Sequence, residues 1–69
     1  GKHTDALPLF ERAITIERNT LGTDHPILAQ GLRGYADLLR TLGRGADAAR
    51  ADVEASQVEQ RFKARQAAG

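Results

Sequence analysis

LGTDHP, residues 21–26, is the stretch that decides how this chain folds. Gly22 can adopt the left-handed conformation that commonly ends a helix. Pro26 suits the first position of a new helix, where its missing N–H leaves no bond unmade, and His25 or Asp24 suits the N-cap before it. The stretch therefore predicts that one helix stops and another begins within a few residues.

The run behind this turn, residues 26–42, has the apolar spacing of a helix with one buried face. Gly31 and Gly34 lie inside it, and each costs about 1 kcal/mol relative to Ala. We expect close approach of a neighbouring segment to compensate for that cost, and we expect Gly43 to end the helix. The apolar residues recur every three or four positions, which is typical of a packed amphipathic helix: Leu28, Leu32, Tyr35, Ala36, Leu39 and Leu42.

The segment before the turn predicts a helix over residues 4–20 that is apolar on more than one side. Thr4 or His3 can cap it, and Asp5 places negative charge in its first turn, where the helix dipole favours it. A helix that is apolar over a wide arc needs neighbours on both sides. Here the arc holds Ala6, Leu7, Leu9, Phe10, Ala13, Ile14 and Ile16.

The third segment repeats the first. GRGADA at residues 43–48 echoes GKHTDA at residues 1–6, an offset of 42 residues (43 − 1). Internal repetition of this length is typical of a solenoid. Asp52 stands where the first helix has Phe10, so one face of the third helix is polar, as in the last unit of an array. The register predicts a helix over residues 45–66 whose seam is Ala48, Ala51, Ala55, Val58 and Phe62.

Composition restricts the class of protein. Sixty-nine residues form one small unit, just below the roughly 70–80 residues at which a single core becomes comfortably self-sufficient. The chain has no Cys, which excludes a disulfide, a thiolate metal site and a Cys nucleophile. No apolar run approaches the roughly 20 residues of a membrane span, and no basic-then-apolar leader opens the sequence. We therefore expect a cytoplasmic protein that does not associate with membranes.

Catalytic, metal and cofactor sites are not predicted. His3 and His25 lie in separate turns, without a third ligand at a coordinating spacing. Ser56 is the only Ser and has no nucleophile motif around it. The glycines form no phosphate-binding loop. We expect no enzyme activity, no metal and no cofactor.

The charge pattern argues against a nucleic-acid partner, because the formal net charge is only +1 and no segment is strongly one-signed. Arg61, Lys63 and Arg65 near the end of the third helix are expected to complement the negative end of that helix. A weaker alternative is that they contact nucleic acid or another anionic surface.

Residues 6–13, ALPLFERA, together with LGTDHP, resemble a tetratricopeptide repeat of the 42-residue variety found in kinesin light chains and many bacterial repeat proteins. The resemblance implies an all-α fold: antiparallel helical hairpins of a right-handed α-solenoid, in the order helix B, helix A, helix B. It also implies that residues 1–69 are one fragment, the C-terminal part of a longer array. Arg33-Gly34 stands where the kinesin group often has paired Asn residues, so that ligand mode is not carried over.

The resemblance implies a function, which is a scaffold that binds peptide or protein segments on the concave helix-A face. Arg33 could hold a carboxylate in bidentate fashion, Asp37 could take a basic group or a backbone N–H, and Gly34 would let a peptide approach closely. The alternative is a solvated face with an Arg33–Asp37 pair one turn apart. The candidate peptide-binding residues are Gln30, Arg33, Gly34, Asp37, Arg40 and Thr41.

The first helix offers a second candidate surface. Leu9 and Ile16, joined by Leu7 or Ile14, are expected to face outward, and large exposed apolar patches usually mark an interface. Either an upstream helix covers this patch, or copies of the chain associate through it as a homo-oligomer. A structural alternative to the scaffold role follows: a capping or self-association element of a repeat array with no ligand of its own.

Overall fold

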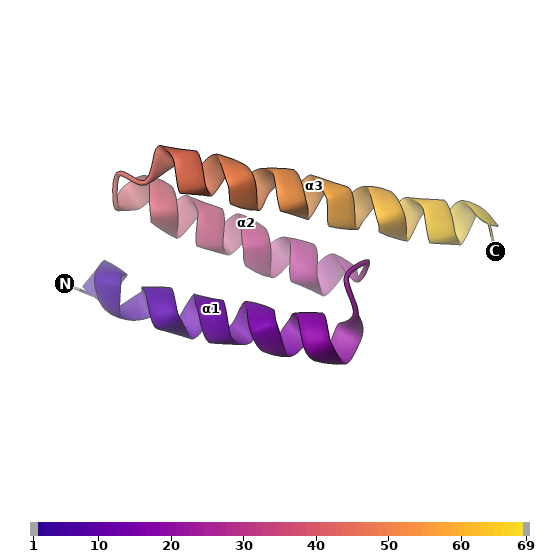
Figure 1. The fold of residues 1–69 in the computed structure, drawn as a ribbon, viewed down its shortest axis with the longest axis horizontal. Helices are drawn as coiled ribbons and strands as arrows, with labels where there is room; N and C mark the ends of the chain where they lie inside the picture. The colour runs from indigo at the N-terminus through magenta and orange to yellow at the C-terminus, as the bar shows by residue number, and fades with distance from the viewer. Residues whose placement is uncertain (1, 69) are drawn as a thin grey trace.

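The computed structural model describes residues 2–68, which form three helices and no strand. Figure 1 shows the second helix between the other two, with successive helices running in opposite directions. The predicted all-α arrangement is confirmed. The helices are α1 (Lys2–Leu21), α2 (Pro26–Thr41) and α3 (Gly45–Ala68).

The helix boundaries differ from the expected ones by one or two residues. α1 begins at Lys2, so His3 and Thr4 lie in its first turn and the prediction that one of them caps it is wrong. α2 ends one residue before the expected position, and α3 continues two residues past it. Helix ends depend on the local cap and on tertiary contacts, which residue spacing does not fix.

The turn between α1 and α2 has the predicted geometry. Gly22 has a φ of 87°, the left-handed conformation expected at a helix end. His25 is the N-cap of α2: its backbone is extended and its Nδ1 accepts a hydrogen bond from the Ile27 N–H at 3.2 Å. Pro26 occupies the first turn, where no intrahelical N–H partner is needed. The chain therefore reverses direction in four residues.

The turn between α2 and α3 is closed by a paired set of backbone hydrogen bonds. Gly43 has a φ of 79°. The Arg44 N–H donates to the Leu39 carbonyl at 2.8 Å, and the Gly43 N–H donates to the Arg40 carbonyl at 3.0 Å. This pattern is a Schellman cap, and it satisfies carbonyls that the end of a helix leaves without partners. Gly43 ends the second helical segment, as predicted.

The core lies mainly between α2 and α3. The predicted seam of α3 is confirmed, since four of its five members are buried and Phe62 is half-buried. Alanine supplies most of that seam, so the two helix axes can approach closely and the leucines of α2 fill the space. The buried side chains are Leu28, Ala29, Leu32, Ala36 and Leu39 of α2 and Ala48, Ala51, Ala55 and Val58 of α3.

The glycines of α2 make room for α1. A Cβ at Gly34 would lie 3.0 Å from Cε1 of the Phe10 ring, and one at Gly31 would lie 2.7 Å from Oε1 of Glu17. The expected close approach is therefore present, although side chains of α1 rather than its backbone occupy the space. This contact offsets part of the cost of two glycines inside a helix.

α1 turns Ile14 and Leu7 inward, so the prediction that either lies on the outer face of this helix is wrong. Ile14 is buried in the core, and Leu7 packs against the cluster formed by α2 and α3. Two residues span about 200° around a helix. Leu9 and Ile16, each two residues further along, therefore point away from the core and remain exposed.

The C-terminal part of α3 clamps the first turn. Arg61 donates to the Thr23 carbonyl from Nε at 3.2 Å and from Nη2 at 2.9 Å, and Arg65 donates to the Asp24 carboxylate at 2.6 Å. The hydrogen bond from Arg65 holds the pKa of Asp24 below its usual range. These two arginines thus bind the turn, rather than only complementing the helix dipole as expected.

The two glycines of α2 are predicted to respond differently to alanine. Gly31→Ala should stabilise the fold by up to about 1 kcal/mol, because only the flexible end of Glu17 must move. Gly34→Ala should gain little or nothing, because the new Cβ presses on the Phe10 ring. Urea unfolding followed by circular dichroism measures both, and an equal gain at the two positions would contradict the packing of Phe10 described here.

The N-cap predicts a second pair of variants. His25→Ala should destabilise the chain by about 1 kcal/mol, because the Ile27 N–H loses its acceptor. His25→Asn should keep or improve stability, since Asn is among the best N-caps. His3→Ala, at an exposed position within α1, is the control and should leave the thermal midpoint unchanged.

Candidate functional site

The outer face of α2 exposes five of the six predicted peptide-binding residues, and Gly34 is the one that is partly buried. Gln30, Asp37 and Thr41 are exposed although helices pack on both sides of α2. The Asp37 side chain is 80% exposed. The Thr41 hydroxyl already donates to the Asp37 carbonyl at 3.0 Å, so it is satisfied within the helix. The free groups on this face are therefore the Gln30 amide and most of the Asp37 carboxylate.

Arg33 and Arg40 are about half-exposed, and both contact carboxylates of α3. Arg33 pairs with Glu59 and lies 3.7 Å from Asp52, with its Nη2 also 3.5 Å from the Ser56 hydroxyl. Arg40 pairs with Asp52 and, at 2.8 Å, with Asp37. The Arg33–Asp37 pair given as the alternative does not form among residues 2–68, because Arg33 contacts the carboxylates of α3 and Asp37 pairs with Arg40.

These ion pairs are half-exposed, so each contributes little stability by itself. Their arrangement is more informative than their energy. Asp52 receives a guanidinium from both Arg33 and Arg40, two turns apart on α2. Asp52, which stands in α3 where α1 has Phe10, is thus paired with arginines of the neighbouring helix α2.

Gly34 does not belong to the open face. Its Cα faces the Phe10 ring of α1, whose Cε1 atom would lie 3.0 Å from an added Cβ. The prediction that Gly34 lets a peptide approach closely is therefore wrong, because this approach is already used by α1. Residue spacing correctly predicted that Gln30, Asp37 and Thr41 are exposed. It did not predict that Gly34 contacts Phe10 of α1.

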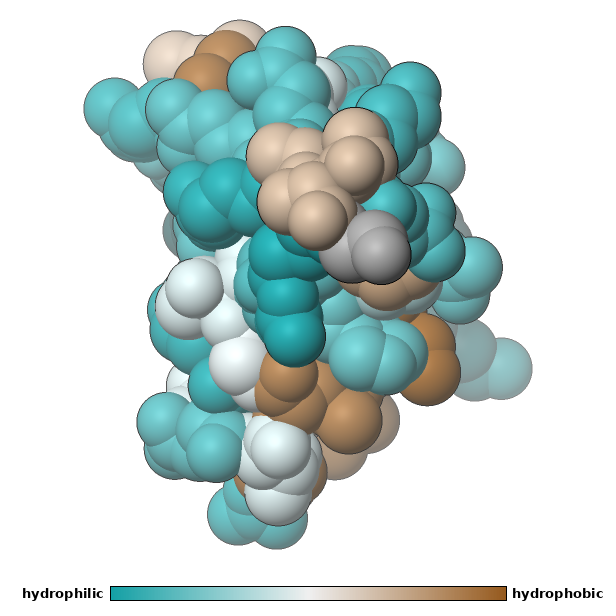
Figure 2. All heavy atoms as spheres, turned by 90° about the vertical axis from the view of Figure 1, so that its right-hand side faces the viewer, coloured by the Kyte–Doolittle hydropathy of each residue, from teal (hydrophilic) through white to brown (hydrophobic). Residues whose placement is uncertain are grey.

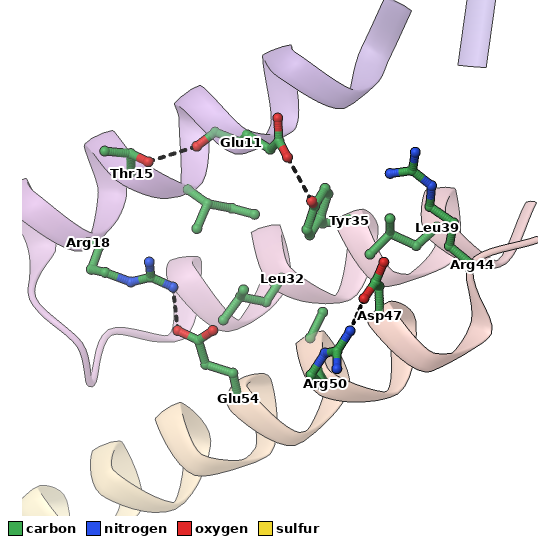
Figure 3. Close-up of a pocket in the computed structure, with 12 residues that line it drawn as sticks. Glu11, Thr15, Arg18, Leu32, Tyr35, Leu39, Arg44, Asp47, Arg50 and Glu54 are labelled. Atoms are coloured by element: carbon green, nitrogen blue, oxygen red, sulfur yellow. Dashed lines mark hydrogen bonds and ion pairs between the residues drawn. The ribbon is translucent and has the colours of Figure 1, made fainter. Parts of the chain in front are cut away.

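A cleft between α1 and α3, on the other side of α2, was not predicted from the sequence. Figure 3 shows it with α1 on one wall, α3 on the other and α2 as the floor. Its volume is about 520 Å³, and Leu32 and Leu39 line its floor. Charged residues of both signs line its rim, and Arg18 of α1 pairs with Glu54 of α3 across it. Arg18 and Glu54 can be seen in the sequence as charged residues, but residue spacing does not show that they lie close together in the fold.

Tyr35 lies in this cleft and points toward α1 (Figure 3). Its hydroxyl donates to Glu11 Oε2 at 3.0 Å, and its ring lies 6.4 Å from the Phe10 ring, centroid to centroid. Burial raises the pKa of Tyr35, and the hydrogen bond to Glu11 and the negative charge of Glu11 raise it further. The residue therefore joins α1 to α2 through both an aromatic contact and a polar contact.

The outer surface of α1 is the remaining candidate. Leu9 is 67% exposed and Ile16 is 54% exposed, and Ala13 between them is exposed as well. Figure 2 looks onto the end of the molecule that holds the α1–α2 turn; hydrophobic spheres gather in its lower part, on the side of α1, and hydrophilic spheres cover most of the rest. Two of the four residues predicted for this surface thus face outward.

Neither a metal-binding cluster nor a membrane-spanning helix occurs within residues 2–68. No group of three acidic, histidine or cysteine side chains in that range is arranged to hold a metal ion. None of the three helices combines the length and the apolar character needed to cross a bilayer.

The position of Tyr35 predicts its titration. It is the only Tyr and the chain has no Trp, so ultraviolet absorbance of the phenolate reports this one group. We expect its pKa to lie above the ordinary value of about 10 and to fall toward it in Glu11→Gln. Because the folded-state pKa is raised, the stabilisation is complete below the unfolded-state value and is lost as pH rises through the folded-state value.

Asp37→Asn is the control for this titration, since Asp37 lies on the open face of α2 away from the cleft. It should leave the Tyr35 curve unchanged. A Glu11→Gln curve that coincides with that of the parent chain would show that the hydrogen bond to Glu11 is not formed in solution.

The family model described as Tetratricopeptide repeat matches residues 1–58. A search of curated proteins and a search of solved structures each found no match. The matched range covers α1, α2 and most of α3, including both turns. The chain therefore belongs to the tetratricopeptide repeat family.

Proposed function

We propose that this chain is part of a protein-binding scaffold that takes a peptide or protein segment on the outer face of α2. Membership of the tetratricopeptide repeat family supports a scaffold for protein–protein interaction. The observation that supports this face is the exposure of Gln30 and Asp37, together with Arg33, Arg40 and Thr41, on a helix that packs against both α1 and α3. The 42-residue offset between α1 and α3 supports the longer variety of the repeat.

The chemistry of the face defines the segment that it would bind. The Gln30 amide can donate to and accept from a peptide backbone. The Asp37 carboxylate lies about two turns further along the same face of α2. It can pair with a basic side chain while it keeps its contact with Arg40. Arg33 and Arg40 then form one side of the site, because ion pairs with Glu59 and Asp52 hold their side chains in place. A segment with a basic residue and an accessible backbone satisfies these groups.

A second candidate function is structural, and a different observation supports it. The α1 residues that face α2 include Leu7, Phe10 and Ile14, whereas the residues 42 positions later are Ala49, Asp52 and Ser56. These small or polar residues give a further helix less apolar surface to pack on than α1 gives α2. In this alternative the chain is the end unit of a helical array and has no ligand of its own.

Selection from a displayed random-peptide library against the immobilised chain tests the first candidate. We expect the selected peptides to be enriched in Lys or Arg, and their affinity to fall roughly tenfold or more in Asp37→Ala, because a charged hydrogen-bonded pair is lost. Fluorescence anisotropy of a labelled selected peptide measures the dissociation constant.

The matched control is Asp47→Ala. Asp47 pairs with Arg50 three residues later, as Asp37 pairs with Arg40, but Asp47 lines the cleft on the other side of α2. Binding should be unchanged in this variant. Equal loss in the two variants would locate binding elsewhere, and no enrichment of binders at all would favour the structural candidate.

A further inference from the structure

The ion pairs between α2 and α3 are connected to one another and form a ladder of alternating charge. Each inner member contacts an opposite charge on both of its sides. In order, the members are Asp37, Arg40, Asp52, Arg33 and Glu59. An isolated exposed pair contributes little, whereas several charges in one network can contribute measurably. The ladder holds three carboxylates and two guanidiniums, so its net charge is −1 (2 − 3).

The members of the ladder differ in how far a ligand can reach them. The Asp37 side chain is 80% exposed, whereas that of Asp52 is 31% exposed. Glu59, at the other end of the ladder, is 45% exposed. A cation that approaches from solvent therefore reaches Asp37 most easily, and the uncompensated negative charge of the ladder favours its binding there.

Arg40 decides whether Asp37 is available to such a cation. Its Nη1 lies 2.8 Å from Oδ1 of Asp37, and its Nη2 contacts Oδ2 of Asp52. Because two different nitrogens make these contacts, Arg40 can keep a carboxylate partner on α3 while Asp37 turns to a ligand. Asp37 would be the only partner left to Arg40 among residues 2–68 if Asp52 lost its charge. A ligand cation would then have to displace Arg40 and leave that guanidinium without a partner.

The 42-residue register shows that α1 has no equivalent of this arrangement. Phe10 is the residue of α1 that corresponds to Asp52, and its ring packs against Gly34 of α2 instead of binding an arginine. The carboxylate at this position is therefore a feature of α3, and its nearest consequence is the orientation of Arg33 and Arg40 on α2.

We propose that Asp52 is a positioning residue for the peptide site: by holding Arg40 from α3, it leaves Asp37 free to bind a basic side chain of the ligand. The inference rests on the proposed function, which is the binding of a peptide segment on the outer face of α2. Asp52 acts through Arg40, and it requires no contact of its own with the ligand.

Two substitutions and their combination test this role, with a labelled basic peptide from the library selection as the probe. Asp52→Asn should weaken binding by about threefold, because Arg40 then competes for Asp37 through a half-exposed pair. Arg40→Gln removes the competitor and should bind the peptide at least as tightly as the parent chain. In the Arg40→Gln background, Asp52→Asn should have no further effect. Fluorescence anisotropy measures each dissociation constant.

The combination separates positioning from a general effect of charge. If Asp52 acted only through the net charge of the surface, its loss would weaken binding equally with and without Arg40, so the two effects would add. The control is Asp47→Asn, which removes the same charge from α3 on the side of the cleft, where Asp47 pairs with Arg50. Its affinity should equal that of the parent chain, and circular dichroism should show the same helix content in every variant.

The outcomes distinguish this inference from the proposed function on which it rests. Additive effects of Asp52→Asn and Arg40→Gln would overturn the role of Asp52. So would full affinity in Asp52→Asn combined with a loss in Asp37→Ala, which would leave the peptide site itself in place. If Asp37→Ala had no effect, or if no basic peptide were selected, the peptide site would be rejected and the role of Asp52 with it.

Discussion

The packing of α2 between α1 and α3 is the constraint on which the rest of this structure depends. Sixty-nine residues cannot form a large core, so almost every buried side chain is used where α2 meets a neighbour. The alanine seam of α3 brings its axis close to α2, and the glycines of α2 admit Phe10 and Glu17 of α1. Small residues therefore decide the distance between helices, and the leucines of α2 fill the space that remains.

α1 and α3 are copies of one helix in the 42-residue repeat, but their exposed surfaces differ. The two sides of the unit are therefore not equivalent. α1 presents apolar side chains both toward α2 and away from it. In α3 the positions that correspond to Phe10, Ile14 and Glu17 hold Asp52, Ser56 and Glu59, and arginines of α2 contact these groups. Apolar surface can be stabilised by a further helix, whereas a satisfied polar face gains nothing from one. The two sides of the unit therefore differ, since the outer side of α1 is apolar and the exposed side of α3 is largely polar.

The same asymmetry separates the surfaces that could bind a partner. The open face of α2 is polar and narrow, with Asp37 as its most exposed charge. The outer face of α1, which holds Leu9, Ala13 and Ile16, is apolar. The proposed peptide site is therefore polar, whereas the outer face of α1 is apolar. Because the two surfaces lie on different elements, one protein could use both at the same time.

The sequence by itself determined the features that follow from local physics. Left-handed glycines, an N-cap and a proline in the first helical turn define the two chain reversals, and the 3.6-residue period defines the buried faces of α2 and α3. The offset of 42 residues identified α1 and α3 as copies. Only the tertiary structure decided which side of α1 faces the core, which carboxylates hold Arg33 and Arg40, and that Tyr35 lies in a cleft beside Glu11. These features depend on the rotation of each helix about its own axis, which is set by side-chain packing between helices and not by the order of residues within one.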